Sequence, residues 1–302
     1  MWISKCLKRY LPEIRYSVVD ERSIDSLGLI NSTCDKSLCS FVDDEKYLTS
    51  ISNNIHMLLI TKELLKSIQL KNVGYIIVDN PRQVFFQLHN KLQCNKEYIR
   101  TSFDTEIAST AKISEFVSIS NKNVKIGENV VIEPFVTIYE NTIIEDGCII
   151  RSGARIGGTG FEQKRKENEM FLVEHLGGTI LHHNVEVQNN TCIDRAIYPW
   201  DNTIIGEYTK MDNLVHIGHA VKIGSHCLIT AQVVFAGRVN VKNDVWIGPG
   251  AIIRNGISIG KGARVNMGSV VTKDVPENGS VTGNFAIPHE IFMDNLKNSV
   301  KK

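Results

Sequence analysis

The sequence predicts a mainly β protein in which a small α/β domain precedes a parallel β-helix built from six-residue repeats. Aliphatic residues recur at every sixth position over most of the chain beyond residue 104. Residues 1–100 hold 13 of the 19 leucines and only 2 of the 22 glycines, whereas residues 101–302 hold 47 of the 64 isoleucines and valines. Because leucine suits helices and β-branched residues suit strands, the 302 residues divide into two parts of different class.

The first part, residues 1–103, mixes helix-like and strand-like segments. SISNNIHMLLITKELLKSIQL and NPRQVFFQLHNKL are helix-like or mixed, and NVGYIIVD has the composition of a strand. We therefore expect a small α/β domain here.

The second part, residues 104–275, carries the six-residue period. After three degenerate repeats and a slip of one residue, six isoleucines share one register: Ile126, Ile132, Ile138, Ile144, Ile150 and Ile156. A second block runs in steps of six from Leu181 to Val271, with Pro199 as its exception. A chance run of aliphatic residues would not hold one register for so many steps, so the period is a specific signal of a β-helix.

In a parallel β-helix each repeat is a short strand followed by a corner. The aliphatic side chain points inward, and successive coils stack at the spacing of hydrogen-bonded strands, about 4.8 Å. Glycine often follows the inward residue, as at Gly206, Gly218 and Gly224. We expect these glycines to turn the corners, because glycine tolerates backbone angles that other residues avoid.

Two segments leave the repeat. GTGFEQKRKENEMFLVEHLGG, residues 158–178, is charged and interrupts the register, so we expect it to protrude from the solenoid. It is either a plain surface excursion or a flap that covers a substrate, since long loops on rigid scaffolds often carry function. We expect residues 276–302 to form a C-terminal tail with one short helix.

Composition excludes several classes of function. The 34 basic and 33 acidic residues leave a net charge of +1, which gives no electrostatic case for binding nucleic acid or anionic membrane. No apolar run reaches the roughly 18–20 residues of a membrane span, and the N-terminus lacks the apolar core of a signal peptide. The seven cysteines are scattered without a C-x-x-C pair. We therefore expect a cytoplasmic protein with free thiols, no metal, no nucleic-acid partner and no integral membrane association.

The segment MDNLVHIGHAVKIG, residues 211–224, holds the candidate site. His219 stands two positions after the inward Ile217, so it falls at a coil corner and faces outward. Its position leaves two interpretations open: a solvated corner residue, or an imidazole that takes a proton at neutral pH. We interpret His216 as a packing or interface residue.

These residues carry a resemblance to a known family. DNTIIGEYTKMDNLVHIGHAVKIG resembles the catalytic coils of the UDP-3-O-acylglucosamine N-acyltransferases of lipid A synthesis, and HLGGTILHHNVEVQNNTCIDRA resembles the coils before them. GTGF resembles the loop ahead of their sugar site, and SFVDDEKYL resembles their base-stacking segment. The resemblance spans nearly the whole chain and implies a left-handed β-helix and a homotrimer with active sites between subunits.

The resemblance also implies roles for residues in the coils. It makes His219 the general base and the backbone N–H of Gly237, one coil later, the oxyanion donor. Such a donor contributes roughly 10²–10³ in rate, and glycine lets it approach closely. Asp212 either fixes the tautomer of His219 or only caps its own corner.

Four further residues are implied in nucleotide-sugar binding. Phe41 and Tyr47 would stack on the nucleotide base, although small domains also bury aromatic residues for packing. Gly160 and Phe161, from the GTGF motif, would lie at the sugar.

The sequence departs from that family near its C-terminus. The second histidine that the family carries roughly two coils after the catalytic one is missing from GAIIRNGISIG, and the tail is too short for the helical extension that helps to receive acyl carrier protein. The final coils, from WIGPGAIIRNG to VTGNFAIP, instead resemble coenzyme-A-dependent sugar acetyltransferases. That likeness would put Lys273, Gly283 and Asn284 beside the acyl donor.

We therefore expect an N-acyltransferase that moves an acyl group from acyl-CoA to a UDP- or dTDP-linked amino sugar in the synthesis of a surface polysaccharide such as O-antigen. The alternative is a UDP-3-O-(3-hydroxyacyl)glucosamine N-acyltransferase of lipid A synthesis that uses acyl carrier protein. A carbonic anhydrase on this scaffold needs three zinc-binding histidines, and the residue five after His219 is Gly224 rather than histidine. A non-catalytic scaffold is the remaining alternative.

Overall fold

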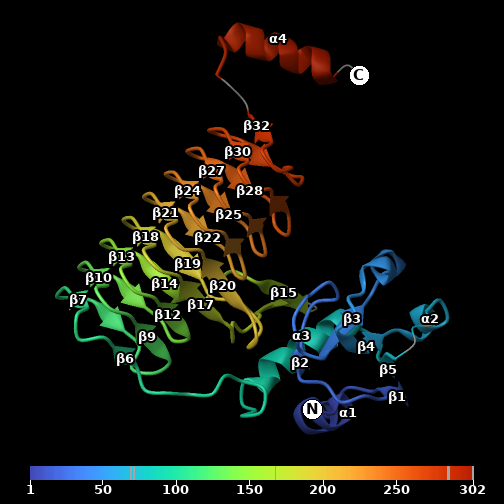
Figure 1. Ribbon diagram of the computed structural model, residues 1–302. Coiled ribbons are helices and arrows are strands. Elements are labelled where there is room, and N and C mark those ends of the chain that lie inside the picture. Colours follow the sequence, from blue (N-terminus) through green and yellow to red (C-terminus); the bar gives the residue numbers. More distant parts are fainter. Residues whose placement is uncertain (69, 71, 167, 284–285, 301–302) are drawn as a thin grey trace.

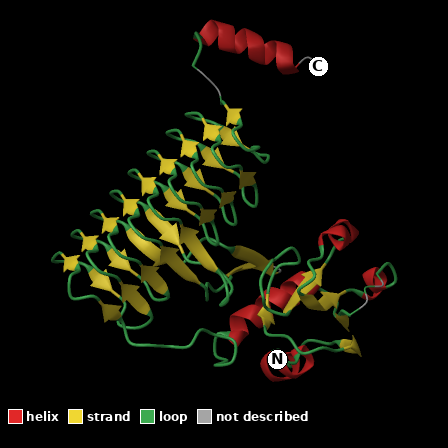
Figure 2. Ribbon diagram, in the orientation of Figure 1, coloured by secondary structure: helices red, strands yellow, loops and turns green. Residues whose placement is uncertain are grey.

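The protein consists of a left-handed parallel β-helix and an α/β unit that lies beside it (Figure 1). The computed structural model describes residues 1–302 except 69, 71, 167, 284–285 and 301–302. Strands dominate the chain, and the helices are few and lie near its two ends (Figure 2). The predicted fold class is confirmed.

The α/β unit is a five-stranded sheet with helices packed on it. The strands follow the order β1-β5-β4-β3-β2, parallel except for β1: β1 (Ser17–Asp20), β2 (Ser26–Leu27), β3 (Leu38–Val42), β4 (Ile55–Ile60) and β5 (Gly74–Ile77). The helical segments are α1 (Ile3–Tyr10), the 3₁₀ helix η1 (Glu45–Ser50), α2 (Lys62–Leu65) and α3 (Pro81–Leu92). Helix α3 begins with Pro81 behind an Asn80 cap, whose Oδ1 accepts a hydrogen bond from the Gln83 N–H at 3.1 Å.

The β-helix has three faces, each a parallel sheet to which every coil adds one short strand. The first face holds β7 (Lys112–Ile113), β10 (Val131–Ile132), β13 (Ile149–Ile150), β18 (Glu186–Val187), β21 (Lys210–Met211), β24 (Leu228–Ile229), β27 (Trp246–Ile247), β30 (Arg264–Val265) and β32 (Ser280–Val281). The second face holds β8 (Ser118–Ile119), β11 (Thr137–Ile138), β14 (Arg155–Gly158), β19 (Cys192–Asp194), β22 (His216–Ile217), β25 (Val234–Phe235), β28 (Ile252–Ile253) and β31 (Val270–Val271). The third face holds β6 (Glu106–Ile107), β9 (Val124–Ile126), β12 (Thr142–Ile144), β17 (Gly178–Leu181), β20 (Asn202–Ile205), β23 (Lys222–Ile223), β26 (Asn240–Val241) and β29 (Ser258–Ile259).

The inward residues of the predicted register form one continuous core. Ile217 pairs with Phe235 one coil later, and both side chains are fully buried. The one-residue slip before the first block is also present, because Ile107 pairs with Ile126, 19 residues later rather than 18. The side chains two positions before the inward residues fill the rest of the interior, as Val215 and Val233 do.

Gly157 has the predicted left-handed backbone angle, with a φ of 80°, but Gly206, Gly218 and Gly224 follow their inward residues for another reason. The left-handed backbone angle lies two residues further on, for example at Ala220 with a φ of 59°. Gly218 and Gly224 have ordinary φ angles, but a Cβ at either position would stand under 3.0 Å from the backbone of the next coil. Glycine is therefore required there by the close stacking of coils and not by the corner itself.

Two excursions interrupt the coils. The first, the segment 158–178, protrudes as predicted and contains a β-hairpin of β15 (Gln163–Lys166) and β16 (Glu169–Leu172). The second, residues 195–201, is a loop that the sequence did not reveal. Leu181 pairs with Ile205, 24 residues later rather than 18, so Pro199 lies in this loop and not in a strand.

Both excursions pack against the α/β unit. The Asn90 side chain of α3 donates to Leu172 O at 2.7 Å and accepts from the Glu174 N–H at 2.9 Å. Trp200, from the second excursion, donates its Nε1–H to Leu27 O at 2.9 Å. Val173, Ile197 and Tyr198 are buried in the core of the α/β unit. The excursions thus connect the two parts of the chain.

The C-terminal tail holds one helix, α4 (His289–Val300), in agreement with the expected short helix. None of the helices in the described part of the chain combines the length and the apolar character that a membrane crossing requires. The boundaries 1–103, 104–275 and 276–302 stay our proposal for the division into domains.

Candidate active site

A cavity of about 830 Å³ lies between the α/β unit and the β-helix. The α/β unit, both excursions and the coils contribute to its wall. The lining side chains that the argument uses are Phe41, Tyr47, Arg82 and Phe86 from the α/β unit, Glu162 and Lys164 from the hairpin excursion, Tyr198, Trp200 and Asp201 from the second excursion, and His219, Lys222, Arg238 and Asn240 from the coils.

His219 is a buried residue of this cavity. It follows β22 at the corner between the second and third faces, as predicted, but its side chain is only 8% exposed. The two excursions and the α/β unit cover this corner, so the solvated alternative is wrong. Its Nε2 lies 3.1 Å from Glu162 Oε2, while Nδ1 is buried and has no hydrogen-bond partner among the described residues.

Gly237 lies against the ring of His219, at the same corner one coil later. A Cβ at position 237 would stand 2.5 Å from both Cε1 and Nε2 of the imidazole, so a side chain there would collide with the ring. The next residue ties the two corners together, since the Arg238 N–H donates to His219 O at 2.9 Å. No acceptor for the Gly237 N–H occurs in the described part of the chain, which leaves this donor free beside the imidazole.

Glu162 is an ionised carboxylate at the centre of the site. Burial alone would raise the pKa of Glu162, but hydrogen bonds with His219 and Lys164 and the nearby charges of Lys164 and Arg238 outweigh it and lower the pKa to about 2. Lys164 pairs with Oε1 of the carboxylate, and His219 meets Oε2. The excursion thus holds a negatively charged carboxylate in contact with the imidazole.

A second group of titratable residues lies behind His219. The rings of His175 and His219 meet edge to face, with centroids 5.5 Å apart, and His175 Nδ1 lies 2.9 Å from Val173 O. Burial lowers the pKa of His175 to about 4, and the positive charge of His219 acts in the same direction. Asp194 Oδ2 lies 3.7 Å from His216 Nε2. Burial raises the pKa of Asp194, and the charges of His216 and His219 oppose that change. His216 therefore contacts a carboxylate beside the site.

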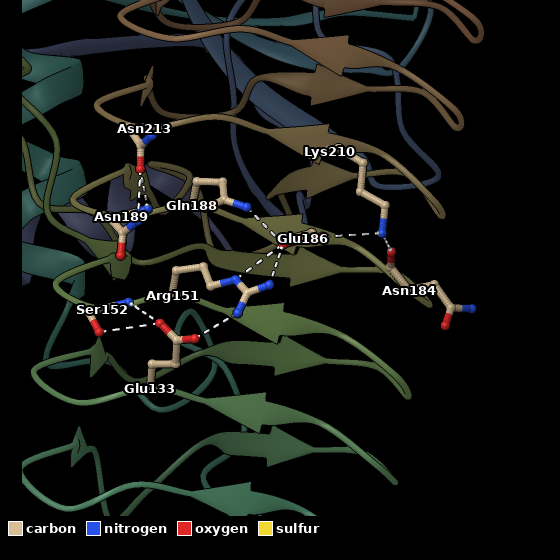
Figure 3. Close-up of polar contacts among 9 residues, drawn as sticks. All are labelled: Glu133, Arg151, Ser152, Asn184, Glu186, Gln188, Asn189, Lys210 and Asn213. Carbon is tan, nitrogen blue, oxygen red and sulfur yellow. Dashed lines mark hydrogen bonds and ion pairs between the residues drawn. The ribbon is translucent and has the colours of Figure 1, made fainter.

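Asp212 lies at a different corner from His219. It stands between the first and second faces, where its Oδ1 accepts hydrogen bonds from the N–H and the side chain of Asn213 at 2.7 and 2.8 Å. Asn213 in turn contacts Asn189 in the coil before, at the edge of a polar network on the first face (Figure 3). Within this chain Asp212 caps its own corner, and the carboxylate that contacts His219 belongs to Glu162.

Phe41 and Tyr47 both line the cavity and are half-buried. Phe41 also packs on Phe85 and Phe86, with ring centroids 5.0 and 5.7 Å apart. The Arg82 guanidinium lies 5.3 Å from the centre of the Phe41 ring. Phe41 therefore packs against other aromatic residues of the α/β unit and also forms part of the cavity wall.

The GTGF motif is divided between the interior and the surface. A Cβ at Gly160 would stand 2.8 Å from Asp194 Oδ2 and 2.9 Å from His175 Nε2, so this backbone passes closely over the second group of titratable residues. Phe161 is 87% exposed and does not line the cavity of its own chain. The following residue, Glu162, enters the cavity instead.

The residues expected at the acyl donor lie at the far end of the β-helix. Lys273 is exposed. Gly283 packs on the last coil, where a Cβ would stand 2.5 Å from the Ser269 Cα. Neither lines the cavity that holds His219. Asn284 falls outside the described residues.

Several cavity residues were missed from the sequence. Glu162 and Lys164 lie in the excursion that was singled out, but the charged sequence gave no sign of which side chains turn inward. Trp200 and Asp201 lie in the excursion around Pro199, whose break of the apolar register was the available signal. Arg238 follows Gly237 directly. Because Gly237 lies one coil after His219, the same spacing would have placed Arg238 at this corner.

Comparisons with known proteins agree with this architecture. The model of the bacterial transferase hexapeptide (six repeats) family matches residues 123–158 and 238–273. The UDP-3-O-acylglucosamine N-acyltransferase of Helicobacter pylori strain 26695 is 29% identical over an alignment that spans all of this chain and 95% of the relative. The enzyme of the same name from Methylobacillus flagellatus is 31% identical, over 80% of this chain and 75% of the relative.

Among solved structures, a UDP-N-acetylglucosamine acyltransferase from Francisella novicida is similar with a TM-score of 0.51 and 24% identity. The likeness covers 63% of this chain and 71% of that one, and it concerns the fold.

Proposed function

The chain belongs to the family of the UDP-3-O-acylglucosamine N-acyltransferases, and we propose on this basis that it transfers an acyl group to the amino group of a UDP-linked, 3-O-acylated glucosamine. The observation that carries the proposal is the pairing of His219 with Gly237 in the wall of one cavity. An imidazole and a free backbone N–H, side by side, are the two groups that acyl transfer from a thioester needs.

The nucleotide sugar spans the cavity from the α/β unit to the coils. Phe41 and Tyr47 hold the base at one end, and His219 meets the sugar amine at the other. Basic side chains line the wall between them and suit the diphosphate: Arg82, Lys164, Lys222 and Arg238. Three of these cations already have partners, since Lys164 pairs with Glu162 and Lys222 and Arg82 each lie 2.6 Å from an aspartate, Asp201 and Asp43. Arg238 has no ion-pair partner in the described residues and is thus the guanidinium that an incoming phosphate meets.

Catalysis follows from the two adjacent groups. His219 removes a proton from the acceptor amine, which then attacks the thioester carbonyl carbon. The oxyanion of the tetrahedral intermediate accepts a hydrogen bond from the Gly237 N–H. The C–S bond then breaks, and the imidazolium returns its proton to the leaving thiolate. Because Gly237 has no side chain, its N–H approaches the reacting carbonyl next to the base.

For the acyl donor we propose an acyl carrier protein thioester. The family relationship supports the lipid A activity better than the CoA-dependent transfer expected from the last coils. The residues behind that expectation, Lys273 and Gly283, do not line the cavity. We further propose a homotrimer, in which the exposed Phe161 of one chain reaches a neighbouring site, and a cytoplasmic location, where such donors occur and where the seven free cysteines stay reduced.

The test is an acyl-transfer assay with four combinations of substrates. Acetyl-CoA and 3-hydroxyacyl carrier protein are each offered with UDP-3-O-acylglucosamine and with a dTDP-linked amino sugar, and the amide product is measured by mass spectrometry. We expect turnover with the carrier protein and UDP-3-O-acylglucosamine. Turnover only with acetyl-CoA and an amino sugar without the 3-O-acyl chain would overturn the proposal.

A further inference from the structure

Glu162 stands on the open side of the His219 ring. Both side chains line the cavity, but Nδ1 of the imidazole is fully buried. The 8% of the side chain that is exposed therefore lies at its other atoms. Of the two ring nitrogens this leaves Nε2 for the acceptor sugar, and Glu162 Oε2 lies 3.1 Å from that atom. The carboxylate thus occupies the position from which a substrate approaches the base.

The acceptor in N-acyl transfer is an amine, and amines of this kind carry a proton over much of the range near neutral pH. An ammonium group has three N–H donors and no acceptor, so it needs more than one acceptor around it. Resting on the proposed function, we propose that the ammonium group of the acceptor sugar binds between Glu162 and His219 and donates one hydrogen bond to each. Glu162 is then a specificity-determining residue that selects an amine over a neutral group.

The surrounding charges fit this arrangement. Lys164, from strand β15, which begins directly after Glu162, holds Oε1 and leaves Oε2 directed at Nε2. Hydrogen bonds with His219 and Lys164 outweigh the effect of burial and keep the carboxylate ionised, and the charge of Arg238, at the corner after β25, acts in the same direction. Behind the imidazole lie His175 and Asp194. The carboxylate therefore stays ionised, the lysine fixes its orientation, and one of its oxygens is available to a cation.

Proton transfer balances in this geometry. In the unliganded site the Nε2–H of His219 donates to Glu162. When the substrate ammonium takes the place of this N–H as the donor to Glu162, the ring proton of His219 lies on Nδ1, and Nε2 offers its lone pair to the ammonium. His219 takes one ammonium proton, and Glu162 stabilises the resulting imidazolium. The neutral amine attacks the thioester, the C–S bond breaks, and the imidazolium proton goes to the thiolate. The attacking nitrogen still carries two protons, and one of them is released to solvent as the amide forms. An ammonium and a thioester thus give an amide, a thiol and one proton.

The binding experiment needs no acyl donor. Calorimetry compares UDP-glucosamine, which carries the free amine, with UDP-N-acetylglucosamine, whose acetamide is neutral, on the full chain at pH 7. A charge-assisted hydrogen bond predicts a preference for the amine of at least about tenfold. Glu162→Gln is expected to abolish the preference. Glu169→Gln, the same change at an exposed position of the same hairpin, is expected to keep it.

A kinetic arm separates binding from positioning. For Glu162→Gln we expect KM for the acceptor to rise about tenfold near pH 6.5. Above the pKa of the amine, where the acceptor is neutral, we expect the difference in KM between the variant and the unmodified protein to become smaller. UDP alone is expected to bind both variants as it binds the unmodified protein, which shows that the cavity is intact. Loss of kcat with an unchanged KM at every pH would identify Glu162 as a positioning residue only and overturn the proposal.

The two proposals fail in different ways. Absence of acyl transfer with a retained, Glu162-dependent preference for the amine contradicts the proposed activity and supports the ammonium site. Acyl transfer by a protein that binds the two UDP-sugars equally, or by a Glu162→Gln variant that keeps the preference, contradicts the ammonium site alone.

Discussion

The backbone of Gly237 lies against the imidazole of His219 one coil earlier, and a Cβ at position 237 would stand 2.5 Å from Nε2 of the ring. Gly237 has an ordinary φ angle, so alanine is compatible with its backbone and only the imidazole forbids it. An alanine at position 237 therefore tests the site by adding a single methyl group next to the imidazole.

Gly237→Ala is expected to displace the imidazole and lower kcat by about 10²-fold or more, because base and oxyanion donor are then out of alignment. The matched control is Gly158→Ala, where the added Cβ would stand 3.7 Å from Tyr139, an ordinary contact. Steady-state kinetics of both variants, with their thermal unfolding midpoints, check the prediction. Equal kcat values for the two variants would contradict the assigned role of Gly237.

His219→Asn is expected to reduce kcat by about 10²–10⁴-fold with little change in the KM for the nucleotide sugar, because it removes the proton acceptor and keeps a polar group of similar shape. His183→Asn serves as the control, since His183 is 51% exposed and pairs with Glu145 away from the cavity. An unchanged acylation rate in the His219 variant would rule out its role as the base.

Tyr47→Ala is expected to raise the KM for the UDP-sugar about tenfold and to leave kcat nearly unchanged, because stacking on a base contributes about 1–3 kcal/mol to binding alone. Tyr208→Ala removes an aromatic side chain from an exposed corner and is expected to leave both constants unchanged. Calorimetric titration with UDP distinguishes the two variants. A lowered kcat for Tyr47→Ala at unchanged affinity would speak against base stacking.

Stability is expected to fall as the pH is lowered from about 6.5 to about 4. Burial lowers the pKa of His89 to about 4, against the opposing hydrogen bond to Glu174 O, and the reference pKa of an unfolded histidine is about 6.5. Between these values the unfolded chain binds the additional proton, so stability rises with pH across the window and falls as acid is added.

His89→Gln tests this assignment. Its denaturant unfolding curves should show a pH slope smaller by about one proton, or roughly 1.4 kcal/mol per pH unit inside the window. The absolute stability of the variant also changes, because His89 bonds to Tyr98 and Glu174, so the slope is the quantity to compare. An identical slope in both proteins would show that His89 does not account for the acid sensitivity.

Much of the scaffold could be predicted because one physical constraint repeats along the chain. Each inward residue must be apolar and a regular coil adds 18 residues, so positions such as His219 and Gly237 could be placed together from their spacing. The cause of the regular glycine spacing was not predictable in the same way. It depends on how closely neighbouring coils approach, which a period of six does not specify.

The rest of the site could not be predicted, because it depends on contacts between segments far apart in the sequence. Glu162 reaches His219 from an excursion that packs against the α/β unit through contacts such as those of Asn90, and nothing in the charged sequence of that excursion marks Glu162 above its neighbours. For Asp212 the sequence left two roles open, orientation of His219 and capping of its own corner, and the structure shows the cap. It is seven residues from His219, but seven residues lead to another corner of a three-sided coil.

The length of the second excursion has a consequence for how such enzymes diversify. Residues 195–201 add one repeat length to the coil, so every later coil keeps its phase and the corner of His219 is undisturbed. A cavity wall that carries Trp200 and Asp201 can therefore vary at constant length while the later coils keep their phase. We expect a graft of an equally long loop from a relative to change acceptor binding and to leave the register of the coils intact.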